Sequence, residues 1–249
     1  MRIIRHNAYI AKRKTRAKLM ALAGFVTLIA TLFVALLPNA IAPAYIVMLI
    51  GFVVFNLGMQ QVGKWTRNPR NDQLLDFQLK GLPERYSMVH YPPIGKRRAE
   101  HLLVHPGGVL LVTAKEIDGA IKANGSKWRR SNPGIRKFLT FSGPQLGNPS
   151  IETEQSVGDV ESWLTEHQLE IDVEGAIVFV HPGAELDVEA PDFPALHGDE
   201  LSQFVQSLEP DPTFSTKERA RLLELLGNGE QVESAAVRTR RRPVKRRAA

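Results

Sequence analysis

A predicted β-hairpin brings together three side chains that could do chemistry, a carboxylate, a hydroxyl and an amine. They belong to Glu100, Thr113 and Lys115. Two apolar runs, 102–104 and 109–112, flank a Pro-Gly-Gly turn, which is typical of a hairpin. If the turn is symmetric, Glu100 faces Thr113, and Lys115 follows on the same face because strand side chains alternate. This arrangement indicates metal-assisted phosphodiester chemistry.

A structural role for the same residues stays open. A glutamate and a lysine at a strand end also form ordinary surface ion pairs, which contribute little to stability. The hairpin is apolar on both faces in its middle, so we expect it to be a central part of a sheet. Its polar end is therefore exceptional, and it is the first place to look for a site.

The elements that would position this hairpin alternate between helices and strands. Helix signals are an apolar face over 72–81 and the pair Asn148-Pro149, a capping residue followed by proline, which begins a helix to about residue 167. Strands are predicted at 86–91, 120–122, 127–130 and 175–180, a possible strand at 137–141, and closing helices at 200–208 and 217–226. This order predicts an α/β fold, a mixed sheet with helices on both sides.

Charge is distributed very unevenly along the chain. The 249 residues contain 32 Lys and Arg against 26 Asp and Glu, and no cysteine, so disulfides and thiolate metal sites are excluded. Residues 1–18 hold seven cations and no acid, and residues 238–247 hold seven more cations. Residues 71–233 hold 15 basic and 26 acidic residues, a net charge of −11. The basic character therefore belongs to the ends of the chain.

Residues 19–63 contain no charged side chain and form two apolar runs, about 19–37 and 42–62, joined across a short turn. A bilayer core needs about 20 helical residues, so each run can span it once. Cations flank both outer ends and none lies in the turn, which predicts a transmembrane hairpin with both termini in the cytoplasm. The alternatives are a signal peptide cleaved near Ala40-Ile41-Ala42, which the second apolar run disfavours, and a buried soluble hairpin, which would carry a polar face.

The predicted organisation therefore has five parts. A basic cytoplasmic segment, 1–18, precedes the hairpin at 19–63, a linker follows at 64–70, an α/β domain occupies 71–227, and a basic tail ends the chain at 228–249. The tail is too basic and too poor in apolar residues to pack, which favours disorder. It could bind anionic lipid, bind nucleic acid or only increase solubility, and a cluster of cations beside a membrane favours lipid.

Several of these segments together resemble the nuclease-related domain (NERD) family, which is related to the restriction-endonuclease-like PD-(D/E)-x-K superfamily. The resemblance covers about residues 71–227. The segments that carry it are 74–83, 100–104, 108–115, Gly119, Trp128, Asn148-Pro149 and 178–180. It implies a restriction-endonuclease-like mixed sheet flanked by helices, and a Mg²⁺- or Mn²⁺-dependent nuclease site.

The resemblance also assigns roles to individual residues. Asp72 matches the acid that starts the first helix, Glu100 matches the aspartate of the first strand, and Lys115 matches the lysine of the Glu-x-Lys motif. The glutamate of that motif falls on Thr113, and a family glutamine falls on Glu152, or on Gln155 one turn later. The implied metal ligands are Asp72 and Glu100. Thr113 removes a carboxylate from a site where Mg²⁺ uses one or two carboxylates with substrate phosphate, so activity is expected to be weak or lost.

The superfamily resemblance further implies nucleic acid as a partner. Cations near the proposed site are Arg97, Arg98, Lys127, Arg129 and Arg130. A basic face there could contact phosphates, although the same charges could equally form a solvated surface. Trp128 could stack on a base, although a strand tryptophan is more often packed in the core. The histidines lack a metal-ligand spacing and are expected to be structural or surface residues.

These observations predict a membrane-tethered nuclease-related protein at the plasma membrane, with its α/β domain in the cytoplasm. It binds nucleic acid and has weak or lost metal-dependent phosphodiesterase activity. The alternative is a non-enzymatic, membrane-associated interaction module that keeps the fold and has lost the chemistry. Whether the chain is an enzyme depends on whether Thr113 can be tolerated in the site.

Overall fold

A computed structural model describes residues 1–95, 98–131, 145–230 and 232–234. The chain divides into two units, which are considered separately. The first contains Met1–His6, Asn71–Arg129 and the residues from Gly147 onward, and the second contains Asn7–Arg70 with Arg130–Leu146. The predicted domain at 71–227 is therefore extended by a segment from the amino-terminal end of the chain. The expected strand at 137–141 lies outside the described residues.

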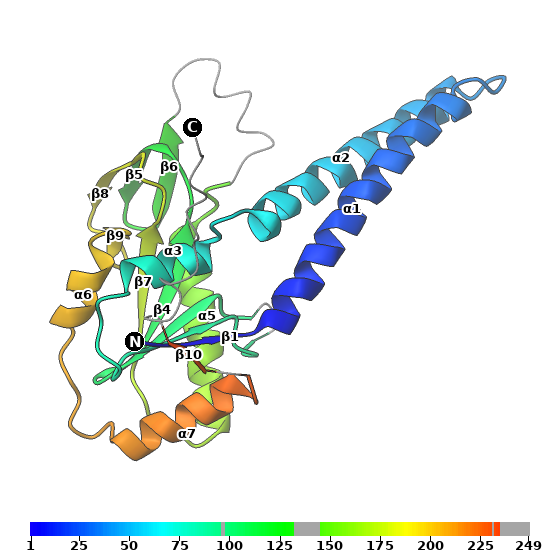
Figure 1. Cartoon of the computed structure of the whole chain (residues 1–249). Helices are drawn as coiled ribbons and strands as arrows, with labels where there is room; N and C mark the ends of the chain where they lie inside the picture. The colour runs from blue at the N-terminus through cyan, green and yellow to red at the C-terminus, as the bar shows by residue number, and fades with distance from the viewer. Residues whose placement is uncertain (96–97, 132–144, 231, 235–249) are drawn as a thin grey trace, which may run out of the picture. The chain divides into compact units, whose positions relative to one another are not determined.

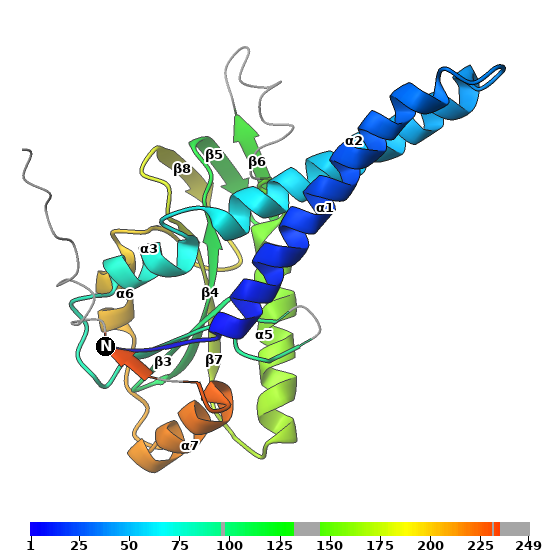
Figure 2. The same cartoon turned by 45° about the vertical axis from the view of Figure 1, so that its right-hand side comes forward.

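The first unit is built on a seven-stranded mixed sheet in the order β10-β1-β2-β3-β4-β7-β9 (Figures 1 and 2). Its strands are β1 (Arg2–Arg5), β2 (Ser87–His90), β3 (His101–His105), β4 (Gly108–Lys115), β7 (Val173–Phe179), β9 (Ala195–His197) and β10 (Val232–Ser234). A second sheet has the order β6-β5-β8, from β5 (Gly119–Asn124), β6 (Lys127–Ser131) and β8 (Ala184–Glu189). The mixed α/β prediction is confirmed.

The predicted hairpin is the centre of the large sheet, and its register is confirmed. Leu102 pairs with Leu111 and His105 with Gly108, so the turn is symmetric about Pro106 and Gly107. Gly108 has a φ of 149° and approaches the carbonyl of Asp172. Every residue of β3 is buried, as are the first five of β4, because β2 and β7 cover both edges and helices cover both faces.

Helices form a layer on each face of the large sheet. On one face, α3 (Asn71–Gln78) and α6 (Leu201–Ser207) pack against Leu103, Leu110 and Val112. On the other, α5 (Pro149–Glu166) and α7 (Thr216–Gly227) pack against Leu102, Leu111 and their neighbours. These four helices lie close to their predicted ranges, because capping residues such as Asn148 and Ser215 mark their starts in the sequence.

The second unit is a pair of long antiparallel helices, α1 (Asn7–Val34) and α2 (Ile41–Thr66). Both are long and apolar enough to cross a membrane, by length and composition. Small residues form the contact between them. A Cβ added at Gly24 would collide with the backbone of Phe55, and one added at Gly58 would collide with the backbone of Ala21. Helix α1 begins well before residue 19, because the basic stretch 12–18 is itself helical.

Candidate functional site

Thr113 and Lys115 lie at the carboxyl end of β4, where they meet the first turn of α5. The Lys115 Nζ is 2.7 Å from Oε2 of Glu152, and the hydroxyls of Thr113 and Thr153 hydrogen-bond to each other at 2.7 Å. The Lys115 side chain is 11% exposed and the Glu152 side chain 47%. The two polar side chains of β4 that the sequence predicted as site residues are therefore paired with two consecutive residues of one helix.

Local capping fixes the start of α5 beside this strand. Asn148 caps the helix by accepting a hydrogen bond from the Ile151 amide, and its Nδ2 donates to the Ser126 carbonyl at 3.0 Å. Pro149 occupies the first turn, where its missing N–H has no cost. The indole Nε1 of Trp128 donates to the Ser150 hydroxyl at 2.8 Å. Because the cap is tied to the second sheet in two places, Glu152 is held next to Lys115.

Trp128 is a packed residue of the domain. Its ring centroid lies 5.8 Å from that of Phe179, in addition to its hydrogen bond to Ser150. These contacts support the structural alternative over base stacking, because they engage both the ring and the only donor of the indole.

Glu100 directly precedes β3 and continues its ladder with β2, since the Tyr91 amide donates to the Glu100 carbonyl at 2.8 Å. Strand alternation gives Glu100 the same face as Leu102, the face that α5 covers. That is the face predicted for Glu100, Thr113 and Lys115 together. Glu100 is partly exposed.

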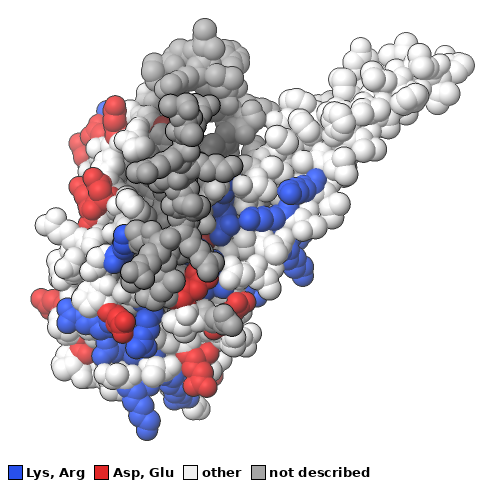
Figure 3. Space-filling model, in the orientation of Figure 1, with Lys and Arg blue, Asp and Glu red and all other residues white. Residues whose placement is uncertain are grey.

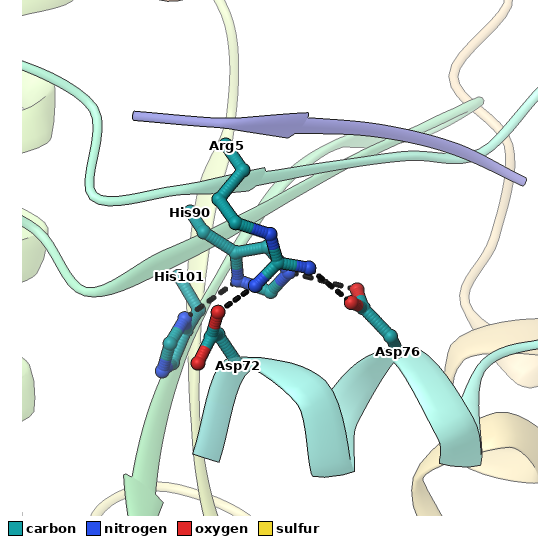
Figure 4. A network of polar contacts seen from close by, with 5 residues as sticks. All are labelled: Arg5, Asp72, Asp76, His90 and His101. Atoms are coloured by element: carbon teal, nitrogen blue, oxygen red, sulfur yellow. Dashed lines mark hydrogen bonds and ion pairs between the residues drawn. The ribbon is translucent and has the colours of Figure 1, made fainter. Parts of the chain in front are cut away.

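Asp72 belongs to a different cluster, on the face covered by α3. Figure 4 shows the Arg5 guanidinium between the carboxylates of Asp72 and Asp76, with which it forms two ion pairs. The chain of contacts continues through two imidazoles. His90 Nε2 is 2.8 Å from Asp76 Oδ1, and His90 Nδ1 is 2.8 Å from His101 Nδ1 (Figure 4). Arg5, Asp72, His90 and His101 are each at most 1% exposed.

The electrostatics of this cluster favour an ionised Asp76. Burial by itself would raise the pKa of Asp76, but the hydrogen bond and charge of His90 and the charge of Arg5 outweigh burial and lower that pKa. Because a carboxylate only accepts hydrogen bonds, it sets the contacting nitrogen of His90 as a donor. Both ring nitrogens of His90 are therefore engaged, one by Asp76 and the other by His101.

The residues implied as metal ligands do not fit a divalent ion. Asp72 is ion-paired with Arg5 on the face covered by α3, whereas the alternation of β3 gives Glu100 the face covered by α5. Thr113 contributes a neutral hydroxyl, already bonded to Thr153. Within the described part of the chain, no group of three or more His, Asp or Glu side chains could hold a metal ion. Asp72 is thus engaged by Arg5, and Thr113 by Thr153.

The predicted nucleic-acid residues have different environments. Arg97 lies outside the described residues, and the Arg98 guanidinium donates to the Tyr91 carbonyl at 3.0 Å. On β6, Lys127 and Arg129 are exposed, whereas Arg130 is half-buried. Figure 3 shows basic side chains over the lower part of α1 and α2 and acidic side chains around β8.

Sequence reasoning missed Arg5, Asp76 and the pairing of Glu152 with Lys115. The sequence contains a pattern that indicates Arg5 and Asp76 as candidates. Asp72 and Asp76 are four residues apart, so they share one helix face, and Arg5 ends an Arg-Ile-Ile-Arg stretch with strand character. Their meeting could not be inferred, because β1 and α3 are separated by the entire apolar segment.

Comparison with known families agrees with this architecture. Residues 67–180 match the family model of the nuclease-related domain, NERD. No curated protein and no solved structure matches the chain. The matched range contains β2 through β7, with α3 and α5, and thus both clusters except for Arg5. The similarity to the nuclease-related domain thus covers residues 67–180 of the chain.

Proposed function

We propose that this chain is a membrane-anchored, nuclease-related protein that binds nucleic acid and has lost metal-dependent cleavage. One observation carries the loss of cleavage. The polar side chains expected to do the chemistry are engaged by other protein side chains, Asp72 by Arg5, Thr113 by Thr153 and Lys115 by Glu152. Cleavage needs carboxylates that converge on a metal, together with a lysine directed to the phosphate.

The packing of the hairpin supports membrane anchoring. The buried positions of α1 and α2 are mostly Ala, Gly and Thr, whereas their large apolar side chains face outward, including Leu32, Phe33 and Leu49 at 67%, 68% and 62% exposure. A soluble hairpin would bury these side chains. Small residues between helices and large ones outside are typical of pairs that pack in lipid.

The charged end of the hairpin supports a defined orientation. The amino end of α1 and the carboxyl end of α2 lie together and carry the cations of 12–18 and 64–70. Tyr9 and Trp65 pack edge to face there, with ring centroids 5.9 Å apart, and Arg13 lies over the Tyr9 ring. Aromatic and basic residues of this kind suit the cytoplasmic interface of a bilayer. The basic tail at 238–247, proposed to bind anionic lipid, lies outside the described residues.

Topology can be tested with single cysteines, because the chain has none of its own. In intact cells, a membrane-impermeant maleimide should label Asn39→Cys and should label Lys217→Cys only after permeabilisation. The cysteine-free parent is the control. Labelling of both variants from outside, or of neither before permeabilisation, would contradict the hairpin topology.

The proposed nucleic-acid contact is the exposed pair Lys127 and Arg129 on β6. Binding by the full chain in nanodiscs is measured by fluorescence anisotropy with duplex DNA and with RNA, across a salt series. Each lost phosphate contact reduces the salt slope on duplex DNA by about 0.9, so the Lys127→Ala/Arg129→Ala double variant should lose about 2. Lys80→Ala/Lys217→Ala, which also removes two exposed cations, should keep the wild-type slope.

Cleavage is tested on the same preparations. With Mg²⁺ or Mn²⁺, the wild type should neither nick nor degrade DNA or RNA. Thr113→Glu should stay inactive too, since Asp72 remains paired with Arg5. Wild-type cleavage that Glu100→Ala or Lys115→Ala abolishes would refute the proposed loss of activity.

A second candidate is a non-enzymatic interaction module, and the same internal pairing favours it. If the full chain shows no salt-sensitive binding to either nucleic acid, this alternative replaces the first proposal. Both candidate functions include the membrane anchor.

A further inference from the structure

We propose that Arg5 takes the place of a divalent metal ion at the carboxylates of α3, so that strand β1 closes this site. The inference goes beyond the proposed function, and it does not depend on nucleic-acid binding. It concerns Arg5, Asp72 and Asp76, with His90 and His101 behind them (Figure 4).

Asp72 and Asp76 require a neighbouring positive charge to be stable in the folded protein. They stand one helical turn apart on α3 and both face the sheet, with Asp72 at 0% and Asp76 at 8% exposure. Two buried carboxylates at this spacing repel each other and lose their hydration, which is costly unless a cation lies between them. In metal-dependent nucleases a divalent ion can supply this positive charge.

In this protein, Arg5 supplies the positive charge between Asp72 and Asp76. Strand β1 runs parallel to β2, and the register sets Arg5 directly beside His90. The guanidinium is 1% exposed and ion-paired with both carboxylates, as Figure 4 shows. A planar guanidinium with five donors suits this bridge better than the point charge of a lysine. One side chain therefore supplies positive charge to both carboxylates and also donates a hydrogen bond to Asp76.

The histidines complete a donor set that would otherwise suit a metal. Two carboxylates and two imidazoles are ligands that Mn²⁺ and Zn²⁺ accept. Here, the carboxylates point at Arg5, and His90 bridges Asp76 and His101. No grouping of these side chains forms a metal site in the described residues. The arrangement is thus complete with an internal cation.

Because Arg5 belongs to β1, the pairing of β1 in the sheet controls access of other cations to the two carboxylates. Only His6 separates Arg5 from Asn7, the first residue of the apolar helix α1. Strand β1 is held by pairing with β2 on one side and β10 on the other. Withdrawal of this four-residue strand would expose the carboxylate pair to external cations.

The test is thermal unfolding of the full chain in nanodiscs, for the wild type and for Arg5→Ala. Wild-type Tm should not change with EDTA, Mg²⁺ or Mn²⁺. Loss of one partner of a buried ion pair should lower the Tm of Arg5→Ala by about 6–20 °C. Millimolar Mn²⁺ or methylguanidinium should then raise the Tm of Arg5→Ala and leave the wild type unchanged. Arg2→Ala, in an exposed position of the same strand, is the control and should behave as wild type.

Three results would overturn the proposal. They are stabilisation of the wild type by a divalent ion, an unchanged Tm in Arg5→Ala, and no response of that variant to either added cation. If Arg5→Ala does not fold, the triple variant Arg5→Met/Asp72→Asn/Asp76→Asn decides. Folding of the triple variant supports charge compensation as the role of Arg5, and failure of the triple variant to fold refutes it.

Discussion

Replacing His105 by asparagine should flatten the acid side of the stability profile. His105 ends β3 and is 4% exposed, and its Nδ1 accepts a hydrogen bond from the Gly107 amide at 3.2 Å. Its Nε2 is buried with no hydrogen-bond partner in the described residues. Burial lowers the pKa of His105 from 6.5 to about 4. Asparagine can accept the same hydrogen bond from Gly107 and does not titrate.

The magnitude follows from the two pKa values. Between about pH 6.5 and pH 4 the unfolded chain binds a proton that the folded chain refuses, so stability is complete above this window and falls as the pH falls through it. Each pH unit costs about 1.4 kcal/mol, which gives a total of about 3 kcal/mol. Wild type should lose that much more than His105→Asn between pH 7.5 and pH 4.

The assay is denaturant unfolding at a series of pH values, followed by circular dichroism. A matched control is available, because His181 lies in a second His-Pro-Gly turn and its Nδ1 accepts from the Gly183 amide at 3.0 Å. His181 is less buried than His105, so His181→Asn makes the same substitution in a matching turn at a less buried position. If His105→Asn and wild type have the same slope below pH 6.5, the reasoning from burial is refuted.

Three further predictions concern single contacts. Gly58→Ala should destabilise the hairpin in detergent, because the added Cβ meets the backbone of Ala21, whereas Gly63→Ala, with nothing within 4 Å, should stabilise its helix by up to about 1 kcal/mol. Equal melting of the two variants would contradict the close packing. Glu152→Gln should cost at most about 1 kcal/mol of unfolding free energy, since its carboxylate is 47% exposed, and a loss several times larger would show a stronger pair. Trp128→Phe should cost about 1 kcal/mol through its lost hydrogen bond, and an unchanged midpoint in urea would argue that this bond is absent in solution.

The parts of the fold that the sequence predicted well are specified by local chemistry. Pro106 and Gly107 set the hairpin register, so the pairing of Leu102 with Leu111 could be anticipated from the turn alone. Asn148 with Pro149 marked the start of α5 for the same reason. In both cases, residues within one turn of each other decide the conformation.

The parts that were missed depend on contacts between distant segments. Strand β1 has four residues inside a basic stretch, and its partners are β2 and β10, which no local pattern could indicate. Strands β8 and β9 lie between residues 181 and 199, where the sequence analysis predicted no helix or strand. The pairing of Asp72 with Arg5 was missed because a helix acid can face either side of a sheet until the packing of that helix is known.

The place of β1 in the sheet also bears on how the protein is made. Its two neighbours, β2 and β10, begin at Ser87 and Val232, so one edge of β1 can pair early in synthesis and the other edge only after β10 has been made. During translation, the apolar segment that follows β1 is complete before either neighbour exists. Arg5 therefore does not have both aspartate partners until synthesis has passed the apolar segment and reached Asp76, and the sheet can close only after synthesis has reached β10.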